Sequence, residues 1–258
     1  MSEGDIPNST ATSSQATADF YNRLMRGEEE RGILGKGQRY DPLNLCQKPS
    51  VIRYFDGFVR DLIGPEDNVL DFGCGPGTFS IRAARYCNTV TGVDITEEFV
   101  RVANDSFTAL ELSNAKAVRV PPDRLPFEDG SFDALIMVDV IHHLDDIATS
   151  MTEAIRVIRP GGRVIVFEPN KLNPLIWLIH YLDKNERGLL ALGTPRKYEK
   201  ILKRYASNIR YRYSGIVIGP QSKGFDLVSG LINQPLIYPF LGWLNPKIAF
   251  SAEVNGVG

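Results

Sequence analysis

A glycine-rich segment and an acidic residue downstream have the spacing of a ligand site. One short apolar stretch leads into residues 71–77, with the sequence DFGCGPG, and the next apolar stretch ends at Asp94. Glycines let a backbone turn sharply and pass close to a ligand, because they have no Cβ. A carboxylate at position 94 can accept hydrogen bonds from both hydroxyls of a ribose. The pattern predicts a site for an adenosine-containing cofactor.

The glycine spacing separates two kinds of such cofactor. The dinucleotide fingerprint G-x-G-x-x-G, started at Gly73, requires a glycine where this chain has Thr78. S-adenosylmethionine has no diphosphate and carries an ammonium, a carboxylate and a sulfonium group. Asp71 suits a ligand with an ammonium group, whereas it would repel a diphosphate. The residues therefore favour S-adenosylmethionine and disfavour a dehydrogenase.

Short apolar runs alternate with amphipathic helices in the middle of the chain. The predicted strands are 69–72, 89–93, 116–120, 132–138 and 163–167. The predicted helices are 78–87, a helix that Thr96 caps, and a helix over 147–158 that ends at Pro160-Gly161-Gly162. This alternation predicts right-handed crossovers and a parallel sheet. Ligands of such sheets bind beyond the carboxyl ends of the strands, so the chemistry is expected near residues 71–77, 94, 139 and 168.

The two ends of the chain differ from this middle part. Residues 1–17 are polar and predicted to be a disordered leader, and residues 18–63 form an expected helical cap, with helices over 18–40 and 49–63. Residues 64–258 form the remaining domain. Its last third is expected to hold a helix from Thr194-Pro195, strands at 209–218 and 247–254, and an apolar insert at 225–244.

Bulk composition narrows the function classes. Lys and Arg number 29 against 31 for Asp and Glu, so the net charge of -2 gives no basic footprint for nucleic acid. The three cysteines form no CxxC pair, which favours a reducing, cytoplasmic location, and no Cys/His cluster suggests a metal. No unbroken apolar run is long enough to span a membrane, which leaves peripheral contact open. The expected assembly is a monomer or a homodimer.

Four segments together resemble the class I S-adenosylmethionine-dependent methyltransferases. They are VLDFGCGPG at 69–77, VTGVDI at 90–95, LPFEDGSFD at 125–133 and IRPGG at 158–162. They occur in the order and at the spacing of that family. The resemblance implies an α/β, Rossmann-like, doubly wound sheet of seven strands whose last strand, expected at 247–254, runs antiparallel.

The resemblance also implies which residues meet the cofactor. Position 71 is expected near the ammonium group, and position 139 lies beside the sulfonium. Relatives often recognise adenine with an acidic residue and a backbone N–H before the LPF segment. This chain has Pro121-Pro122 there, and proline has no N–H, so Asp123 is the expected replacement acceptor. The implied cofactor-binding residues are Asp71, Gly73, Cys74, Gly75, Asp94, Ile95, Asp123 and Asp139.

Asp139 and His143 are the candidate catalytic residues. Their spacing resembles small-molecule methyltransferases in which the histidine helps to deprotonate the acceptor, and an ordinary histidine pKa of about 6.5 suits that task. A purely structural His143 is the alternative. Glu168 ends the fifth strand, where it is expected either to face the acceptor or to form a polar turn. Tyr21 and Tyr40 are candidates to close over the cofactor.

The predicted function is methyl transfer from S-adenosylmethionine to a small molecule, leaving S-adenosylhomocysteine. Segments near 171–192 and 221–246 are rich in large apolar residues. They are expected to form lids over a hydrophobic or lipid-linked acceptor, and simple packing or a dimer contact are the alternatives. The competing function is a non-catalytic S-adenosylmethionine-binding protein. The acceptor itself is not specified by the sequence.

Overall fold

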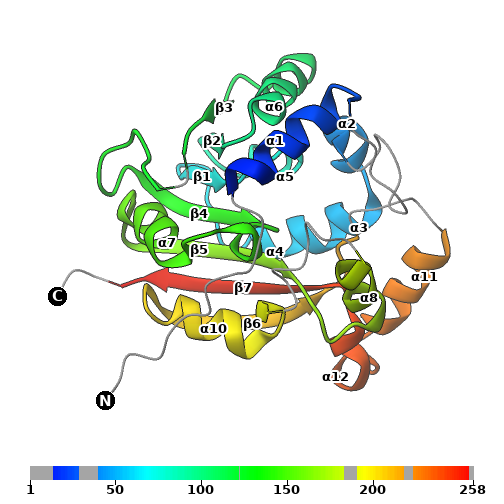
Figure 1. Ribbon diagram of the computed structural model, residues 1–258. Coiled ribbons are helices and arrows are strands. Elements are labelled where there is room, and N and C mark those ends of the chain that lie inside the picture. Colours follow the sequence, from blue (N-terminus) through cyan, green and yellow to red (C-terminus); the bar gives the residue numbers. More distant parts are fainter. Residues whose placement is uncertain (1–13, 29–39, 122, 183–190, 218–222, 256–258) are drawn as a thin grey trace.

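One seven-stranded sheet forms the centre of the protein (Figure 1). The computed structural model describes residues 14–28, 40–121, 123–182, 191–217 and 223–255. The strand order is β3-β2-β1-β4-β5-β7-β6. The strands are β1 (Asn68–Phe72), β2 (Thr89–Asp94), β3 (Ala115–Arg119), β4 (Phe132–Val138), β5 (Ile158–Pro169), β6 (Ala206–Ser214) and β7 (Lys247–Val254). Strand β7 pairs antiparallel with both β5 and β6, while β1 to β5 pair in parallel, so the predicted Rossmann-like sheet with a reversed last strand is confirmed.

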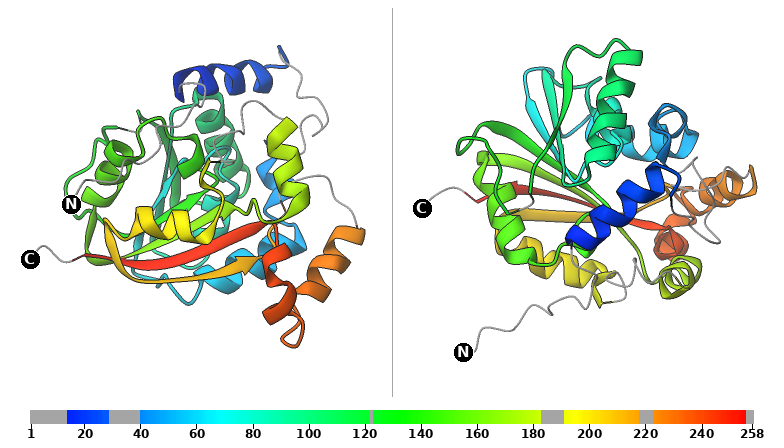
Figure 2. Two further views of the ribbon diagram at one scale, coloured as in Figure 1. Left: turned by 60° about the horizontal axis from the view of Figure 1, so that its bottom comes forward. Right: turned by 45° about the horizontal axis from the view of Figure 1, so that its top comes forward.

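Helices cover both faces of the sheet (Figures 1 and 2). Their bounds are α1 (Ser14–Met25), α2 (Pro42–Leu45), α3 (Pro49–Val51), α4 (Gly57–Val59), α5 (Thr78–Ala83), α6 (Glu97–Ala109), α7 (Ile147–Arg156), α8 (Pro174–Leu182), α10 (Pro195–Leu202), α11 (Lys223–Ile232) and α12 (Tyr238–Leu241). Short non-α turns are η2 (Ile52–Asp56), η3 (Ile141–His143) and η5 (Gly242–Leu244).

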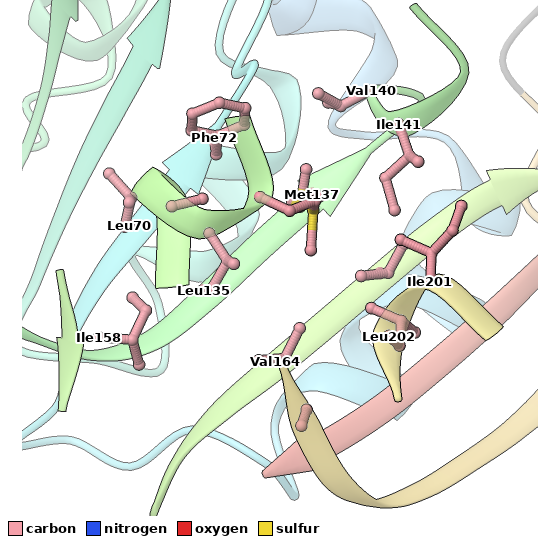
Figure 3. Close-up of a cluster of buried hydrophobic side chains, with 14 of the residues drawn as sticks. Leu70, Phe72, Leu135, Met137, Val140, Ile141, Ile158, Val164, Ile201 and Leu202 are labelled. Carbon is pink, nitrogen blue, oxygen red and sulfur yellow. The ribbon is translucent and has the colours of Figure 1, made fainter. Parts of the chain in front are cut away.

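Strand β4 shows how the two faces of the sheet are buried. Leu135 and Met137 pack on one face in a cluster with Ile201 and Leu202 of α10 (Figure 3). Their neighbours along β4, such as Ile136, pack on the other face in a cluster with α3, α4 and α5. Successive side chains of a strand point to opposite faces, so an unbroken apolar run such as β4 belongs between two helical layers.

The N-terminal cap departs from its prediction in two places. Helix α1 begins at Ser14, inside the segment predicted to be disordered, while residues 1–13 and 29–39 lie outside the described part. The helix predicted over 49–63 is divided into α3, the π-helical turn η2 and α4. In η2 both Phe55 and Asp56 are buried, and Asp56 accepts hydrogen bonds from Arg82 and from the Tyr86 hydroxyl. The predicted continuous helix is therefore interrupted where these two buried side chains pack inward.

Two strands differ from their predicted bounds by more than one residue. Helix α7 ends at Arg156 and β5 starts at Ile158, so the Pro160-Gly161-Gly162 turn lies inside β5. A register shift between Phe132 and Ala134 of β4 accommodates this turn. Strand β6 lies at 206–214 where 209–218 was predicted, and a second irregularity with Asn208 at a φ of 51° lets it reach further back along β7.

The predicted apolar insert contains α11, α12 and η5, and it gathers with α8 at one end of the molecule (Figures 1 and 2). Asn245 ties the parts together, because its backbone carbonyl accepts from the Asn170 side chain and its side chain bonds with Asn233. Residues 183–190, 218–222 and 256–258 are not described. Within the described residues, no helix combines the length and apolar character that crossing a membrane requires.

Candidate functional site

A cavity of about 210 Å³ lies at the carboxyl ends of β1, β2 and β4. Its wall brings together most of the predicted site residues: Asp71, Gly73, Cys74, Gly75, Asp94, Ile95, Asp139 and His143. These residues come from the loops after three neighbouring parallel strands, which is where such sheets bind ligands. Asp123, the predicted adenine acceptor, is exposed and does not line this cavity.

The glycine loop is fixed by its own amides. The Val93 carbonyl accepts from the N–H groups of Gly73 at 2.8 Å and Cys74 at 3.0 Å, and the Gly75 N–H donates to Asp94 Oδ2 at 2.9 Å. Gly73 has a φ of 72°, and a Cβ there would stand 2.5 Å from a methyl group of Val140. At Gly75, with a φ of 53°, no atom lies within 4 Å of an added Cβ. Gly73 therefore allows Val140 to pack against the loop. Gly75 allows the left-handed turn, and the space beside its Cα stays open to the cavity.

Asp71 lies beneath this loop in an almost closed environment. It is 1% exposed, and Oδ2 accepts a hydrogen bond from the Ser80 hydroxyl at 2.5 Å. Burial raises the pKa of Asp71 to about 7, although the Ser80 hydroxyl opposes this. A cationic ligand group would favour the ionised form of this carboxyl.

Asp94 ends β2 with both carboxylate oxygens engaged by backbone. Oδ2 holds Gly75, and Oδ1 accepts from the Thr96 N–H at 2.8 Å. Burial raises the pKa of Asp94, and the two backbone hydrogen bonds counteract this. Each oxygen keeps a second lone pair for a ligand hydroxyl. Thr96 is the N-cap residue of α6, as predicted, but its side chain makes no cap hydrogen bond. Asn22 of α1 instead accepts from the Glu98 N–H at 3.0 Å.

Asp139 follows β4 in a backbone conformation that is uncommon for aspartate. Its φ is 59°, and its N–H donates to the Phe167 carbonyl of β5 at 2.9 Å. The Asp139 carboxylate forms an ion pair with Lys247, the first residue of β7, which is 5% exposed. Lys247 was not predicted as a site residue. The available signal was a lysine at the start of a mostly apolar strand, because lysine is rarely buried without a charged partner.

The two adjacent histidines have different surroundings. His143 lines the cavity, whereas His142 is 2% exposed and its Nδ1 lies 2.6 Å from Oε2 of Glu168. The two imidazole centroids are 4.1 Å apart. The turn η3 carries both rings, so the position of His142 constrains the position of His143.

Glu168 holds this turn in place and does not face an acceptor. It is fully buried and lies outside the cavity wall. Its Oε1 accepts from the N–H groups of Val140 and Ile141, both at 2.8 Å, and its Oε2 accepts from the Tyr198 hydroxyl at 3.2 Å. Both oxygens of this buried carboxylate already have hydrogen-bond partners within the protein, so its role is structural. The structural alternative for Glu168 is therefore correct, and the expectation of an acceptor contact is wrong.

Three aromatic rings close the side of the cavity that Asp94 and Ile95 border. Tyr21 of α1, Tyr40 and Phe99 of α6 have centroids 5.2 to 5.7 Å apart, and all three line the cavity. An ion pair between Arg26 and Glu98 at 2.8 Å fastens α1 to α6. The two predicted N-terminal tyrosines thus reach the site.

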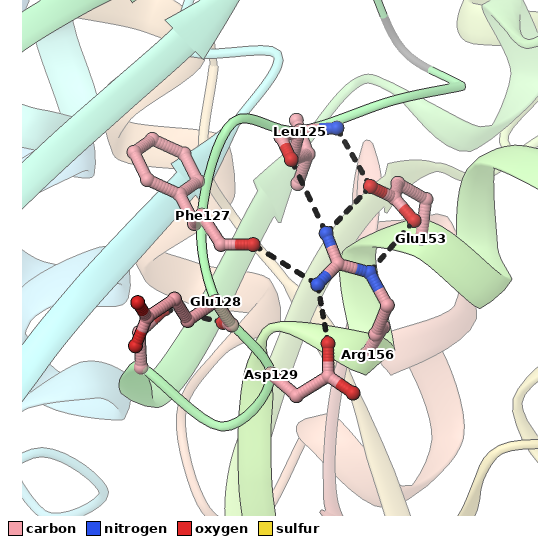
Figure 4. Close-up of polar contacts among 7 residues, drawn as sticks. Leu125, Phe127, Glu128, Asp129, Glu153 and Arg156 are labelled. Carbon is pink, nitrogen blue, oxygen red and sulfur yellow. Dashed lines mark hydrogen bonds and ion pairs between the residues drawn. The ribbon is translucent and has the colours of Figure 1, made fainter.

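The LPFEDGSFD segment is held by an arginine that sequence analysis did not single out. Arg156 of α7 donates to the carbonyls of Leu125 and Phe127 and to the carboxylates of Asp129 and Glu153 (Figure 4). Arg156 lowers the pKa of Glu153 to about 2. Arg156 therefore fixes the segment as a turn between β3 and β4, and its residues do not line the cavity.

Comparison with known proteins places this site in a family. Residues 70–166 match the family described as a methyltransferase domain. A ubiquinone/menaquinone biosynthesis C-methyltransferase of Rickettsia bellii is 30% identical over 167 residues, covering 60% of this chain and 67% of that protein. The chain belongs to the S-adenosylmethionine-dependent methyltransferases. The predicted cofactor of this methyltransferase, S-adenosylmethionine, is thereby confirmed.

Other relatives of the methyltransferase agree in family and fold. A ubiquinone biosynthesis O-methyltransferase of Rhizobium leguminosarum is 32% identical over 52% of this chain and 53% of its own length. A Pyrococcus horikoshii protein of known structure has the same fold, with a TM-score of 0.59, 21% identity, and coverage of 81% of this chain and 93% of its own. The methyltransferase spans 31% to 53% of the length of the first curated relatives that it matches.

The site of the methyltransferase fits an S-adenosylmethionine molecule. The open space over Gly75, the buried carboxylate of Asp71 and the half-buried carboxylate of Asp94 suit a ligand that carries both an ammonium group and a ribose. In the described part of the chain, no three His, Cys, Asp or Glu side chains are grouped so that they could hold a metal ion.

Proposed function

We propose that this methyltransferase transfers a methyl group from S-adenosylmethionine to a small hydrophobic acceptor. The observation that carries the proposal is the single cavity wall shared by the glycine loop, Asp94, Asp139 and His143. A methyl donor and an acceptor bound side by side in one cavity react as if at very high concentration, which contributes on the order of 7–11 kcal/mol to catalysis.

The cofactor is assigned to residues of the first two strand ends. Because the amides of Gly73, Cys74 and Gly75 are already engaged, the loop offers carbonyl oxygens to the methionyl ammonium group. Asp71 adds negative charge beneath that group. Asp94 receives the ribose hydroxyls, and Ile95 flanks the adenine together with the aromatic rings of α1 and α6.

The acceptor is assigned to the third strand end. When bound, the cofactor would supply a methyl group on a sulfonium: the acceptor atom would bond to the methyl carbon as the carbon–sulfur bond breaks, and the sulfur would leave as a neutral thioether. Asp139 would hold the sulfonium side of the bound cofactor, and Lys247 fixes the Asp139 carboxylate in place. His143 accepts the proton of an acceptor hydroxyl, and His142, held by Glu168, keeps the neighbouring ring in position.

Two observations support a hydrophobic acceptor. Val140 and Leu144 line the cavity on either side of His143, and helix α8 brings an apolar segment close by, with the His180 ring 6.2 Å from that of His142. The named relatives act in ubiquinone and menaquinone biosynthesis. We also place the activity in the cytoplasm, because Cys46, Cys74 and Cys87 are buried free thiols.

A methyl-transfer screen tests this function. The purified chain is incubated with S-adenosylmethionine and matched pairs of acceptors, a lipophilic phenol and its polar analogue, and product mass is measured. We expect methylated lipophilic product and S-adenosylhomocysteine in equal amounts. Preference for polar acceptors would overturn the hydrophobic assignment. Calorimetric binding of S-adenosylmethionine with no product from any acceptor would favour the non-catalytic alternative.

A further inference from the structure

The described exposed hydrophobic side chains are concentrated at one end of the protein. We call residues 172–182 and 227–246 the apolar end; they comprise α8, most of α11, α12 and η5, which lie together in Figures 1 and 2. Of the large hydrophobic residues that are exposed, six lie in the first segment and seven in the second, whereas only three of those described, Ile52, Leu110 and Tyr211, lie elsewhere. Contiguous apolar surfaces of this kind mark interaction sites.

The apolar end lacks charged residues and contains both tryptophans of the chain. Neither segment contains a single Asp, Glu, Lys or Arg. Leu236 and Phe240 are 87% and 75% exposed, so neither packs on the protein itself. Both tryptophans of the chain, Trp177 and Trp243, also lie here, 45% and 42% exposed. Tryptophan and tyrosine are enriched where proteins meet the interface of a lipid bilayer.

Basic side chains adjoin the apolar end. A guanidinium nitrogen of Arg53 lies 4.0 Å from the Cβ position of Gly230 in α11. Lys171 precedes the first segment, and Lys197 is close enough to contribute, after burial, to lowering the pKa of Lys171. In a dimer with twofold symmetry, the apolar end of one copy and its basic border would face the same residues of the other copy. Like charges would then approach one another, whereas anionic headgroups would pair with them.

We propose that the apolar end is a docking surface for an anionic lipid bilayer, with α8, α11 and α12 inserted at the headgroup level and Arg53, Lys171 and Lys197 facing the headgroups. The Asn170 side chain donates to the Trp243 carbonyl at 2.7 Å and the Asn173 side chain donates to the Leu244 carbonyl, so the surface is joined to the end of β5 that borders the site. Docking there would bring the end of β5, whose Glu168 holds the Val140–Ile141 turn of the site, toward the membrane. The proposal stands on surface chemistry and does not depend on the identity of the acceptor.

The two tryptophans provide a direct test with the wild-type chain. Vesicles of phosphatidylcholine alone, and of phosphatidylcholine mixed with phosphatidylglycerol, are titrated into the protein while tryptophan emission is recorded. We expect a blue shift and quenching by brominated lipid, both stronger with the anionic mixture. Because Trp177 and Trp243 are the only tryptophans, a shift reports on this surface. Emission that does not respond to either vesicle would overturn the proposal.

Matched variants separate docking from a second copy. Leu178→Glu with Phe240→Glu should reduce cosedimentation with anionic vesicles about tenfold or more, because charges are costly at the bilayer interface. Leu110→Glu, an equally apolar but distant exposed position, should sediment like the wild type. Arg53→Glu should weaken the preference for phosphatidylglycerol. A lipid-free dimer that Leu178→Glu with Phe240→Glu dissociates, without vesicle binding by the wild type, would assign the surface to a second copy instead.

Discussion

Lys247, the first residue of β7, forms an ion pair with Asp139, which follows β4, across the end of β5. The lysine side chain is 6% exposed and the aspartate side chain 20%. The pair joins two strands that are 108 residues apart in sequence. One member lines the cavity, so the antiparallel strand contributes to the site without touching it directly.

Removing this lysine should make the protein less stable. Lys247→Met takes away the cation beside a largely buried carboxylate, and we expect the free energy of unfolding to fall by about 2–4 kcal/mol. Adding Asp139→Asn should restore part of that loss, which urea denaturation of both variants can measure. If Lys247→Met unfolds at the wild-type urea concentration, the ion pair does not stabilise this edge of the sheet.

Asp94 should govern affinity for the cofactor. Asp94→Asn replaces one carboxylate oxygen by a donor, and we expect the Kd for S-adenosylmethionine to rise about 10- to 100-fold. Asp123→Asn is the matched control, because Asp123 is exposed and outside the cavity wall. Isothermal titration calorimetry should find the control unchanged. A comparable loss in Asp123→Asn would reinstate Asp123 as an adenine acceptor.

Substituting the two histidines should have different effects, one on the reaction rate and the other on thermal stability. His143→Gln should lower kcat about 10²- to 10⁴-fold for a hydroxyl acceptor, with cofactor affinity and melting temperature nearly unchanged. His142→Gln should instead lower the melting temperature, because it disrupts the contact with buried Glu168. Single-turnover kinetics and thermal melts distinguish the two. A full rate for His143→Gln would show that this residue is structural.

Asp71 should make the stability of the ligand-free protein depend on pH. Burial raises its pKa from 3.8 to about 7, so the folded state binds the extra proton. The resulting stability is present below the unfolded pKa and is lost as pH rises through about 7. About three pKa units bound the effect at roughly 4 kcal/mol. Comparing Asp71→Asn with the wild type by urea denaturation at several pH values isolates this residue; identical pH profiles would contradict it.

The sequence predicted those parts of the fold and site in which local chemistry determines position. Glycines 73 and 75, followed by Asp94, specify a loop at adjacent strand ends, because side-chain size, backbone freedom and strand spacing are local properties. Strand β4 was predicted at its observed bounds, since an unbroken apolar run requires two covered faces.

What the sequence did not predict depends on contacts between distant residues. Lys247 and Asp139 meet only because β7 pairs beside β5 in one register. Glu168 looked available to an acceptor, but tertiary packing surrounds it with donors from η3 and α10. The π-turn at 52–56 likewise ends at Asp56, whose partner Arg82 lies in another helix. Asp123 was expected at the site by analogy with relatives, and its segment leaves it exposed.

The strand order also means that β6 is synthesised before the strand with which it pairs. Among the described strands β6 pairs with β7 alone, yet it precedes β7 in the chain by residues 215–246. A ribosome adds about 5–20 residues per second, so β6 leaves it on the order of seconds before its hydrogen-bonding neighbour is made. During that interval neither edge of the strand is paired, and unpaired strand edges can associate with other chains. Slow translation across residues 215–246 would lengthen the exposure, whereas chaperone binding there would shorten it.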